Sequence, residues 1–195
     1  MSGSSLSAAG AEPTEPAGML VPRLGLRFAV TYVLIAGVLF SIYGFPFELF
    51  GARTDWLTPY LEAYARLAGG ALQLFDPQVS VSGSRIDGRF ALQIVRNCDA
   101  IEINILFASA VLAFPAPLLR RGIVLLRGLA ILVAANVLRI MCLYYIGVYS
   151  AGSFAVAHEE ILPLLLVAIT ALLFLVSIRQ LTAKPAFPSP LPSTT

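Results

Sequence analysis

Four long apolar runs constrain this chain most, because each is long enough to cross a lipid bilayer. They cover residues 28–47, 101–119, 122–149 and 161–178, and about 17–25 residues suffice for a membrane-spanning helix. Composition agrees: 58% of the residues are hydrophobic and 12% are charged, about half of the charged fraction of roughly 25% in soluble domains. We therefore predict an all-α membrane protein with four transmembrane helices.

Basic residues set the expected orientation of these helices. Arginine and lysine flank the four runs at one end of each: Arg23 and Arg27 before the first, Arg120 and Arg121 between the second and third, Arg179 and Lys184 after the fourth. Because basic residues favour the cytoplasmic side, both chain ends are predicted to be cytoplasmic. Segments 51–97 and 150–158 are then extracytoplasmic. A cleaved signal peptide is the alternative for the first run, but no clear A-x-A site flanks it.

The two ends of the chain differ in composition from its centre. Residues 1–24 begin with small and polar residues punctuated by proline, and residues 182–195 are rich in proline. Such sequences bury too little apolar surface to fold, so we predict two disordered tails around one transmembrane domain, residues 25–181.

The extracytoplasmic segment 51–97 is too long for a simple turn. In DWLTPYLEAYARLAGGALQLF, apolar residues recur mostly at helical spacing, which predicts an amphipathic helix on the membrane surface. The following VSVSGSRIDGRFALQIV alternates in short stretches, and its Asp87–Gly88 pair is a typical turn sequence. A short β-hairpin is expected here, with an irregular loop as the alternative.

The predicted topology brings three reactive side chains to the outer face. Cys98 precedes the second helix and His158 the fourth, both at outer ends. Arg139 lies roughly 25 Å along the third helix from Gly122 at 1.5 Å per residue, in the outer part of a hydrocarbon core about 30 Å thick. We therefore expect a thiol, an imidazole and a guanidinium to share one site.

That trio suits nucleophilic acyl transfer. A helix N-terminus or a nearby cation lowers the pKa of a thiol such as that of Cys98. A histidine can move the thiol proton to a leaving amine, and an arginine in a low-dielectric site can stabilise an oxyanion. His158 is the only histidine, which excludes a multi-histidine metal site, and we expect no metal and no cofactor. Two cysteines are too few for a disulfide framework.

Two of these residues also have structural interpretations. Cys98 alone is compatible with a small residue at a membrane boundary. His158, followed by Glu159 and Glu160, is compatible with a solvated helix start whose acids favour the dipole, although Glu159 could instead orient the imidazole. Cys142 is expected to be an apolar filler, and not a partner of Cys98.

Arg139 has a structural interpretation as well. Glu102, an acid inside the second run, could pair with Arg139 and lock two helices together. Asn136, one helical turn before Arg139, could orient that arginine or form a hydrogen bond between helices. A non-enzymatic membrane assembly protein held by an Arg139–Glu102 lock is therefore the alternative to an enzyme. A solute transporter is disfavoured, since the polar residues gather at one face.

NCDAIEINILFASAVLAFPAPLLRR, ANVLRIMCLYYIGVY and FAVAHEEILPLLL resemble the exosortases and archaeosortases, multi-pass membrane cysteine transpeptidases, and are most like the exosortase H branch. The resemblance covers about residues 25 to 180. It implies that Cys98 is the nucleophile, with Arg139 and His158 as its catalytic partners. One departure is Ala100, which stands where the family usually has glycine. Alanine is acceptable there unless the backbone φ must be positive.

The resemblance also implies an activity and a location. Such enzymes cleave a C-terminal sorting signal of exported proteins, which consists of a short motif, a transmembrane helix and a basic cluster. They pass the new carboxyl end to an acceptor through a thioester. The expected partners are these substrates and membrane lipid, and not nucleic acid. The expected location is the inner membrane of a bacterium, with the active site facing the periplasm.

Overall fold

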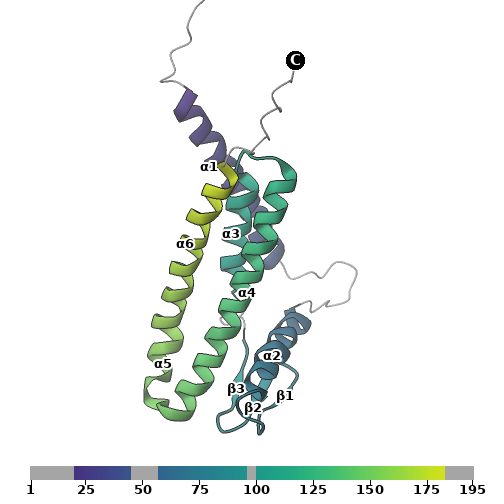
Figure 1. Ribbon diagram of the computed structural model, residues 1–195, viewed down its shortest axis with the longest axis vertical. Coiled ribbons are helices and arrows are strands. Elements are labelled where there is room, and N and C mark those ends of the chain that lie inside the picture. The colour runs from purple at the N-terminus through teal and green to yellow at the C-terminus, as the bar shows by residue number, and fades with distance from the viewer. Residues whose placement is uncertain (1–19, 45–56, 96–99, 183–195) are drawn as a thin grey trace, which may run out of the picture.

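The computed structural model describes residues 20–44, 57–95 and 100–182 (Figure 1). Its helices and strands are α1 (Leu20–Gly44), α2 (Leu57–Gln73), β1 (Ser80–Ser82), β2 (Arg85–Asp87), β3 (Leu92–Gln93), α3 (Ile101–Ala113), α4 (Leu118–Tyr149), the 3-10 turn η3 (Ala151–Ser153), α5 (Phe154–Val156), the π-helical turn η4 (Ala157–Ile161) and α6 (Leu162–Thr182). Helix α1 begins inside the predicted N-terminal tail. Most of both tails lies outside the described residues.

Three helical segments of the described chain are long and apolar enough to cross a membrane. They are Gly25–Gly44, Leu118–Tyr149 and the continuous helical segment Ala151–Thr182. Helix α3 has 13 residues and extends about 20 Å at 1.5 Å per residue, less than a hydrocarbon core of about 30 Å. The prediction of a helical membrane protein is confirmed, whereas the second of the four predicted spans, residues 101–119, is a shorter apolar helix.

Two prolines explain why α3 is short. Phe114 ends the helix with an extended backbone (φ −70°, ψ 134°) because the residue before a proline, here Pro115, disfavours the helical conformation. Pro117 then caps α4. Arg120 and Arg121 consequently lie in the first turn of α4 and not in a loop. Arg121 Nη1 donates to the Leu112 carbonyl at 2.7 Å, which satisfies one of the last backbone acceptors of α3.

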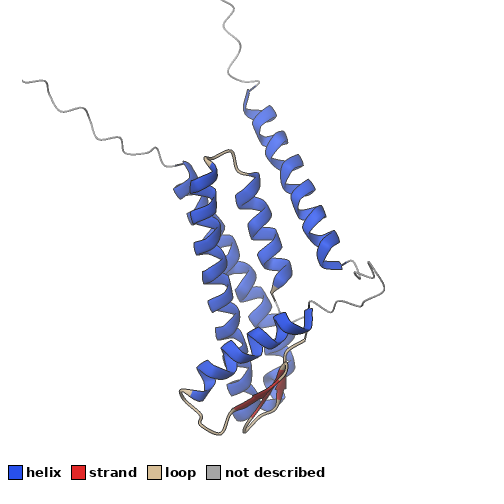
Figure 2. Cartoon of the chain, turned by 90° about the vertical axis from the view of Figure 1, so that its right-hand side faces the viewer, coloured by secondary structure: helices blue, strands red, loops and turns tan. Residues whose placement is uncertain are grey.

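Helices α3, α4 and α6 pack side by side, and α1 lies against α3 at an incline to them (Figures 1 and 2). The buried contact between α3 and α4 includes Phe107 and Val111 of α3 with Val124 and Leu132 of α4. A Cβ at Gly128 would overlap the Phe107 ring, so this glycine allows α3 and α4 to approach closely. Most of α6 is exposed and apolar, as a lipid-facing helix must be.

A small α/β subdomain covers one end of the bundle (Figure 2). Strands β1, β2 and β3 form an antiparallel sheet in that order, with Val81 opposite Ile86 and Ile86 opposite Leu92. The predicted hairpin is confirmed, but its turn lies at Gly83, where φ is +59°, and not at Asp87–Gly88. The predicted amphipathic helix is confirmed as α2. Its buried face packs against the sheet and α4, which is a protein surface and not the predicted membrane surface.

A polar cluster fixes this subdomain to the end of α4. The Tyr144 hydroxyl donates to Asp76 Oδ2 at 3.2 Å, and Arg89 Nε donates to the same oxygen at 2.9 Å. The Arg89 backbone N–H donates in turn to the Tyr144 hydroxyl at 3.0 Å, and its guanidinium lies 5.6 Å from the Tyr149 ring centroid. Hydrogen bonding from Arg89 holds the pKa of the Asp76 carboxyl below its usual range. The chain that leads into residues 96–99 is thereby attached to α4.

Candidate active site

Cys98, the predicted nucleophile, belongs to residues 96–99 and lies outside the described residues. The chain on both sides of this gap is held in place. Ile94 is fully buried and its N–H donates to the Ser84 carbonyl at 2.9 Å. After the gap, Ala100 and Ile101 are both buried at the start of α3. The predicted meeting of Cys98 with Arg139 and His158 therefore stays a prediction.

Ala100 has an unusual backbone conformation. Its φ is 55° and its ψ is 14°, and it is the only residue other than glycine with positive φ in the described chain. A side chain in this left-handed region costs about 1–2 kcal/mol. The Ala100 carbonyl accepts the Asn104 N–H at 3.0 Å, which starts α3. Alanine was expected to be unfavourable at this position only if the backbone φ is positive, and the φ of Ala100 is positive. Backbone strain of this kind is frequent at functional sites.

The Arg139 side chain contacts the backbone of His158, although the two residues lie on different helical segments. Arg139 is 7% exposed, and its Nη2 donates to the His158 backbone carbonyl at 3.4 Å. Helix α4 runs about 32 Å from Leu118 to Arg139 at 1.5 Å per residue, so the arginine lies near the sheet end of a core about 30 Å thick. A buried guanidinium at this depth requires polar neighbours, and a backbone carbonyl is one of them.

The sequence explains why that carbonyl is available to Arg139. In the π-helical turn the Leu162 N–H donates to the Ala157 carbonyl, five residues back. The next backbone nitrogen belongs to Pro163, which carries no hydrogen. The His158 carbonyl therefore has no i+5 donor within the helix. Wide turns of this type frequently mark functional sites.

An aromatic stack holds the imidazole of His158. The Phe154 ring stacks on it with centroids 5.7 Å apart and planes 24° apart. Phe90, between β2 and β3, packs against Phe154 at 5.3 Å, and it lies so close to Gly147 that a Cβ there would overlap its ring. The subdomain thus supports His158 through two phenylalanines that the sequence analysis missed.

Asn136 and Glu102 differ in their surroundings. Asn136 is fully buried on the face of α4 that carries Arg139. Glu102 is exposed, and among the described ion pairs none joins it to Arg139. The predicted alternative of an Arg139–Glu102 lock is therefore wrong for this structure. Glu159 is exposed next to His158, as is Glu160.

Asn104 is a polar residue that the sequence analysis did not single out. Its Oδ1 is buried and accepts no hydrogen bond from any described residue. Buried polar atoms are usually paired, so Asn104 is a candidate site residue one turn after Ala100. Its place as an amide inside the apolar run 101–119 was the available signal.

A pocket of about 90 Å³ lies between α4 and α6. Arg139 is its one charged lining residue, and Cys142 also lines it among leucines. Cys142 is a free, half-buried thiol, as expected of a filler. Within residues 20–44, 57–95 and 100–182, no three histidine, cysteine or acidic side chains gather as a metal site would require.

These features define a class of protein: a helical membrane protein in which a buried arginine contacts the backbone of a histidine on a neighbouring helical segment. The chain belongs to the transmembrane exosortase family, whose family model (Exosortase_EpsH) matches residues 2–183. No curated protein and no solved structure matches the chain. Membership of this family indicates a membrane-embedded transpeptidase of sorting signals.

Proposed function

We propose that this protein is a cysteine transpeptidase or peptidase that cleaves a C-terminal sorting signal of exported proteins through a thioester. The observation that supports this function best is the contact between buried Arg139 and the backbone of His158. It joins two residues of the predicted trio from helices separated in the sequence. The sequence adds Cys98, two residues before strained Ala100.

The proposed reaction has two steps. The Cys98 thiolate attacks the scissile carbonyl, and the C–N bond breaks as His158 gives its proton to the leaving amine. An acceptor then attacks the thioester, loses its proton to His158, and releases the thiolate of Cys98. Arg139 stabilises the oxyanion in both steps, because a buried guanidinium interacts strongly with developing negative charge.

We further propose that the site faces the periplasm of a bacterium whose inner membrane holds the protein. The arginines at the opposite end of the bundle support this orientation. A substrate helix would dock laterally against the bundle, and its signal motif would reach the site from the membrane. The exposed apolar faces of α4 and α6 suit such a docking.

Processing of a tagged substrate tests this function. A co-expressed protein that ends in a short motif, an apolar helix and an arginine cluster serves as substrate, and mass spectrometry of its new C-terminus identifies the cut and the acceptor. We expect no processing by Cys98→Ala at normal protein abundance and normal processing by Cys142→Ala, the matched control. Normal processing by Cys98→Ala would refute the proposal.

A further inference from the structure

An apolar groove lies between α1, α3 and α6, away from the candidate active site. Its volume is about 310 Å³, at the lower end of the range of about 300–1,000 Å³ for ligand pockets. The lining includes Phe28 and Tyr32 of α1, Phe107 and Ala110 of α3, and Ala171 and Phe174 of α6. This apolar lining suits a hydrocarbon chain.

A second hollow of about 250 Å³ continues the groove toward the end of the membrane span. It is lined by Arg27, Phe28, Thr31, Ala113 and Pro115. The two hollows share Phe28. Arg27 lies two residues after Gly25, where the candidate span of α1 begins. The Arg27 guanidinium therefore lies at the depth of the lipid headgroups, beside an apolar groove that suits an acyl chain.

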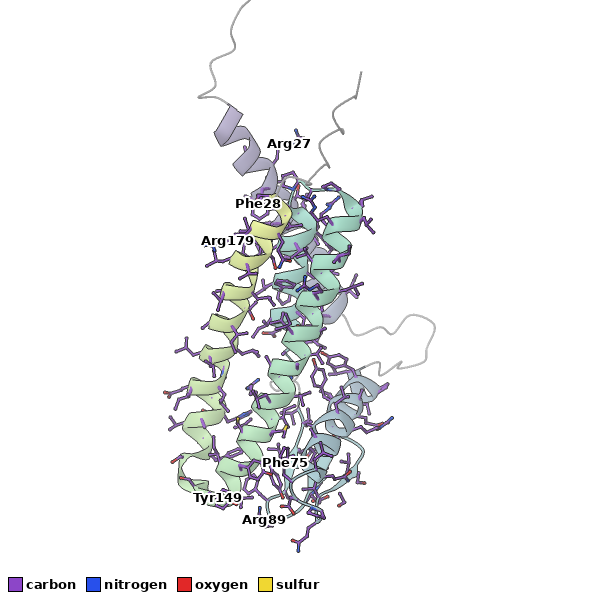
Figure 3. All side chains as sticks on the ribbon, in the orientation of Figure 1. Arg27, Phe28, Phe75, Arg89, Tyr149 and Arg179 are labelled. Atoms are coloured by element: carbon purple, nitrogen blue, oxygen red, sulfur yellow. The ribbon has the colours of Figure 1, made fainter. Side chains whose placement is uncertain are left out.

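The charge of this end of the bundle favours an anion. Figure 3 shows Arg27 and Phe28 at the end opposite to Arg89 and the sheet. Every acidic residue of the described chain belongs to the sheet half: Glu62, Asp76, Asp87, Glu102, Glu159 and Glu160. The described charged side chains at the other end are arginines alone: Arg27, Arg120, Arg121, Arg127 and Arg179. Basic pockets between membrane helices at such an end bind anionic headgroups.

We propose that this groove is a binding site for one anionic phospholipid. Its phosphate lies at Arg27 and Thr31, and one acyl chain lies between Phe28, Ala110 and Ala171. Such a lipid would fill the space where inclined α1 departs from the other helices (Figure 2). The other candidate occupant is a substrate helix, but its basic cluster would meet the positive charge of Arg27.

Photocrosslinking tests the site directly. The full chain is purified, stripped of lipid and titrated with phosphatidylglycerol or phosphatidylcholine that carries a diazirine on an acyl chain. We expect phosphatidylglycerol to crosslink within residues 28–32, 103–110 and 167–174. Arg27→Gln should weaken its apparent affinity about fivefold, the effect of roughly one basic residue near an anionic surface.

Arg179→Gln is the matched control, since it removes an exposed arginine at the same end that lines neither hollow. It should leave the affinity unchanged. Equal weakening by both variants, or equal crosslinking of phosphatidylcholine in the groove, would overturn the proposal. Ala171→Phe should reduce crosslinking by filling the groove, and unchanged crosslinking would count against the site.

Competition decides between the two candidate occupants. A synthetic apolar helix that ends in an arginine cluster is added to the lipid-loaded protein. Continued crosslinking of phosphatidylglycerol in the groove supports the lipid site. Displacement of the lipid by the peptide, with crosslinks from the peptide to the same residues, would assign the groove to a substrate helix instead. Either outcome is independent of whether Cys98 is the nucleophile.

Discussion

Replacing Ala100 by glycine should be nearly neutral for stability, although the alanine is buried. The relief of the left-handed backbone (φ 55°) contributes about 1–2 kcal/mol. Loss of one buried methyl group costs about 0.8 kcal/mol, and the freer unfolded chain costs about 0.4–1 kcal/mol. These effects nearly cancel, so we expect a change in the free energy of unfolding within about 1 kcal/mol of zero.

Ala110→Gly is the matched control for this prediction. Ala110 lies on the same helix and is 8% exposed, against 9% for Ala100, but its backbone is helical. Glycine there loses the methyl group and about 1 kcal/mol of helix propensity, a total near 2 kcal/mol. Equilibrium unfolding in mixed dodecyl maltoside and dodecyl sulfate micelles measures both variants. Equal destabilisation by the two substitutions would refute the claim that Ala100 is strained.

Three further predictions concern the site and its support. Pro163→Ala should restore a helical donor, raise the unfolding free energy, and slow processing about fivefold by weakening the Arg139–His158 contact; slower processing with lower stability would indicate simple damage. Arg139→Lys should reduce processing about 10²–10³-fold at normal abundance, because lysine lacks the planar fork; lost abundance would indicate a structural role instead. The pKa of Asp76 is lowered in the folded state. Its ionised carboxylate therefore contributes to the free energy of unfolding above a pH of about 4, and this contribution is lost as the pH falls through the folded-state pKa. Unfolding from pH 6 to 3 should therefore depend less on pH in Asp76→Asn, and an unchanged dependence would exclude this account.

The sequence predicted the apolar helices because their signal is local. Runs such as 161–178 are recognisable without knowledge of their neighbours. The end of α3 was missed because prolines inside an apolar run, here Pro115 and Pro117, were counted as part of a span. The role of α2 was only half predicted: its amphipathic pattern was visible, but the same pattern suits a membrane surface and a β-sheet.

Contacts between distant segments limited the prediction of the site. The expectation that Arg139 and His158 lie at the same end of the bundle followed from topology, since it needed only the direction of each helix. Support from Phe90 through Phe154 depends on how the subdomain docks, which no local pattern reports. The effect of Pro163 on His158 could not have been inferred, because in a regular α-helix the missing N–H of Pro163 would leave the Glu159 carbonyl without its donor. Only the π-helical turn transfers this effect to the His158 carbonyl.

Trapping of the thioester tests the central claim most directly. Purified protein is incubated with a sorting-signal substrate and hydroxylamine, which attacks thioesters, and the new C-terminus is analysed by mass spectrometry. We predict a C-terminal hydroxamate with wild-type protein and with Cys142→Ala, and none with Cys98→Ala. A hydroxamate formed by Cys98→Ala, or cleavage by wild-type protein without any hydroxamate, would contradict the assignment of Cys98 as a nucleophile acting with Arg139 and His158.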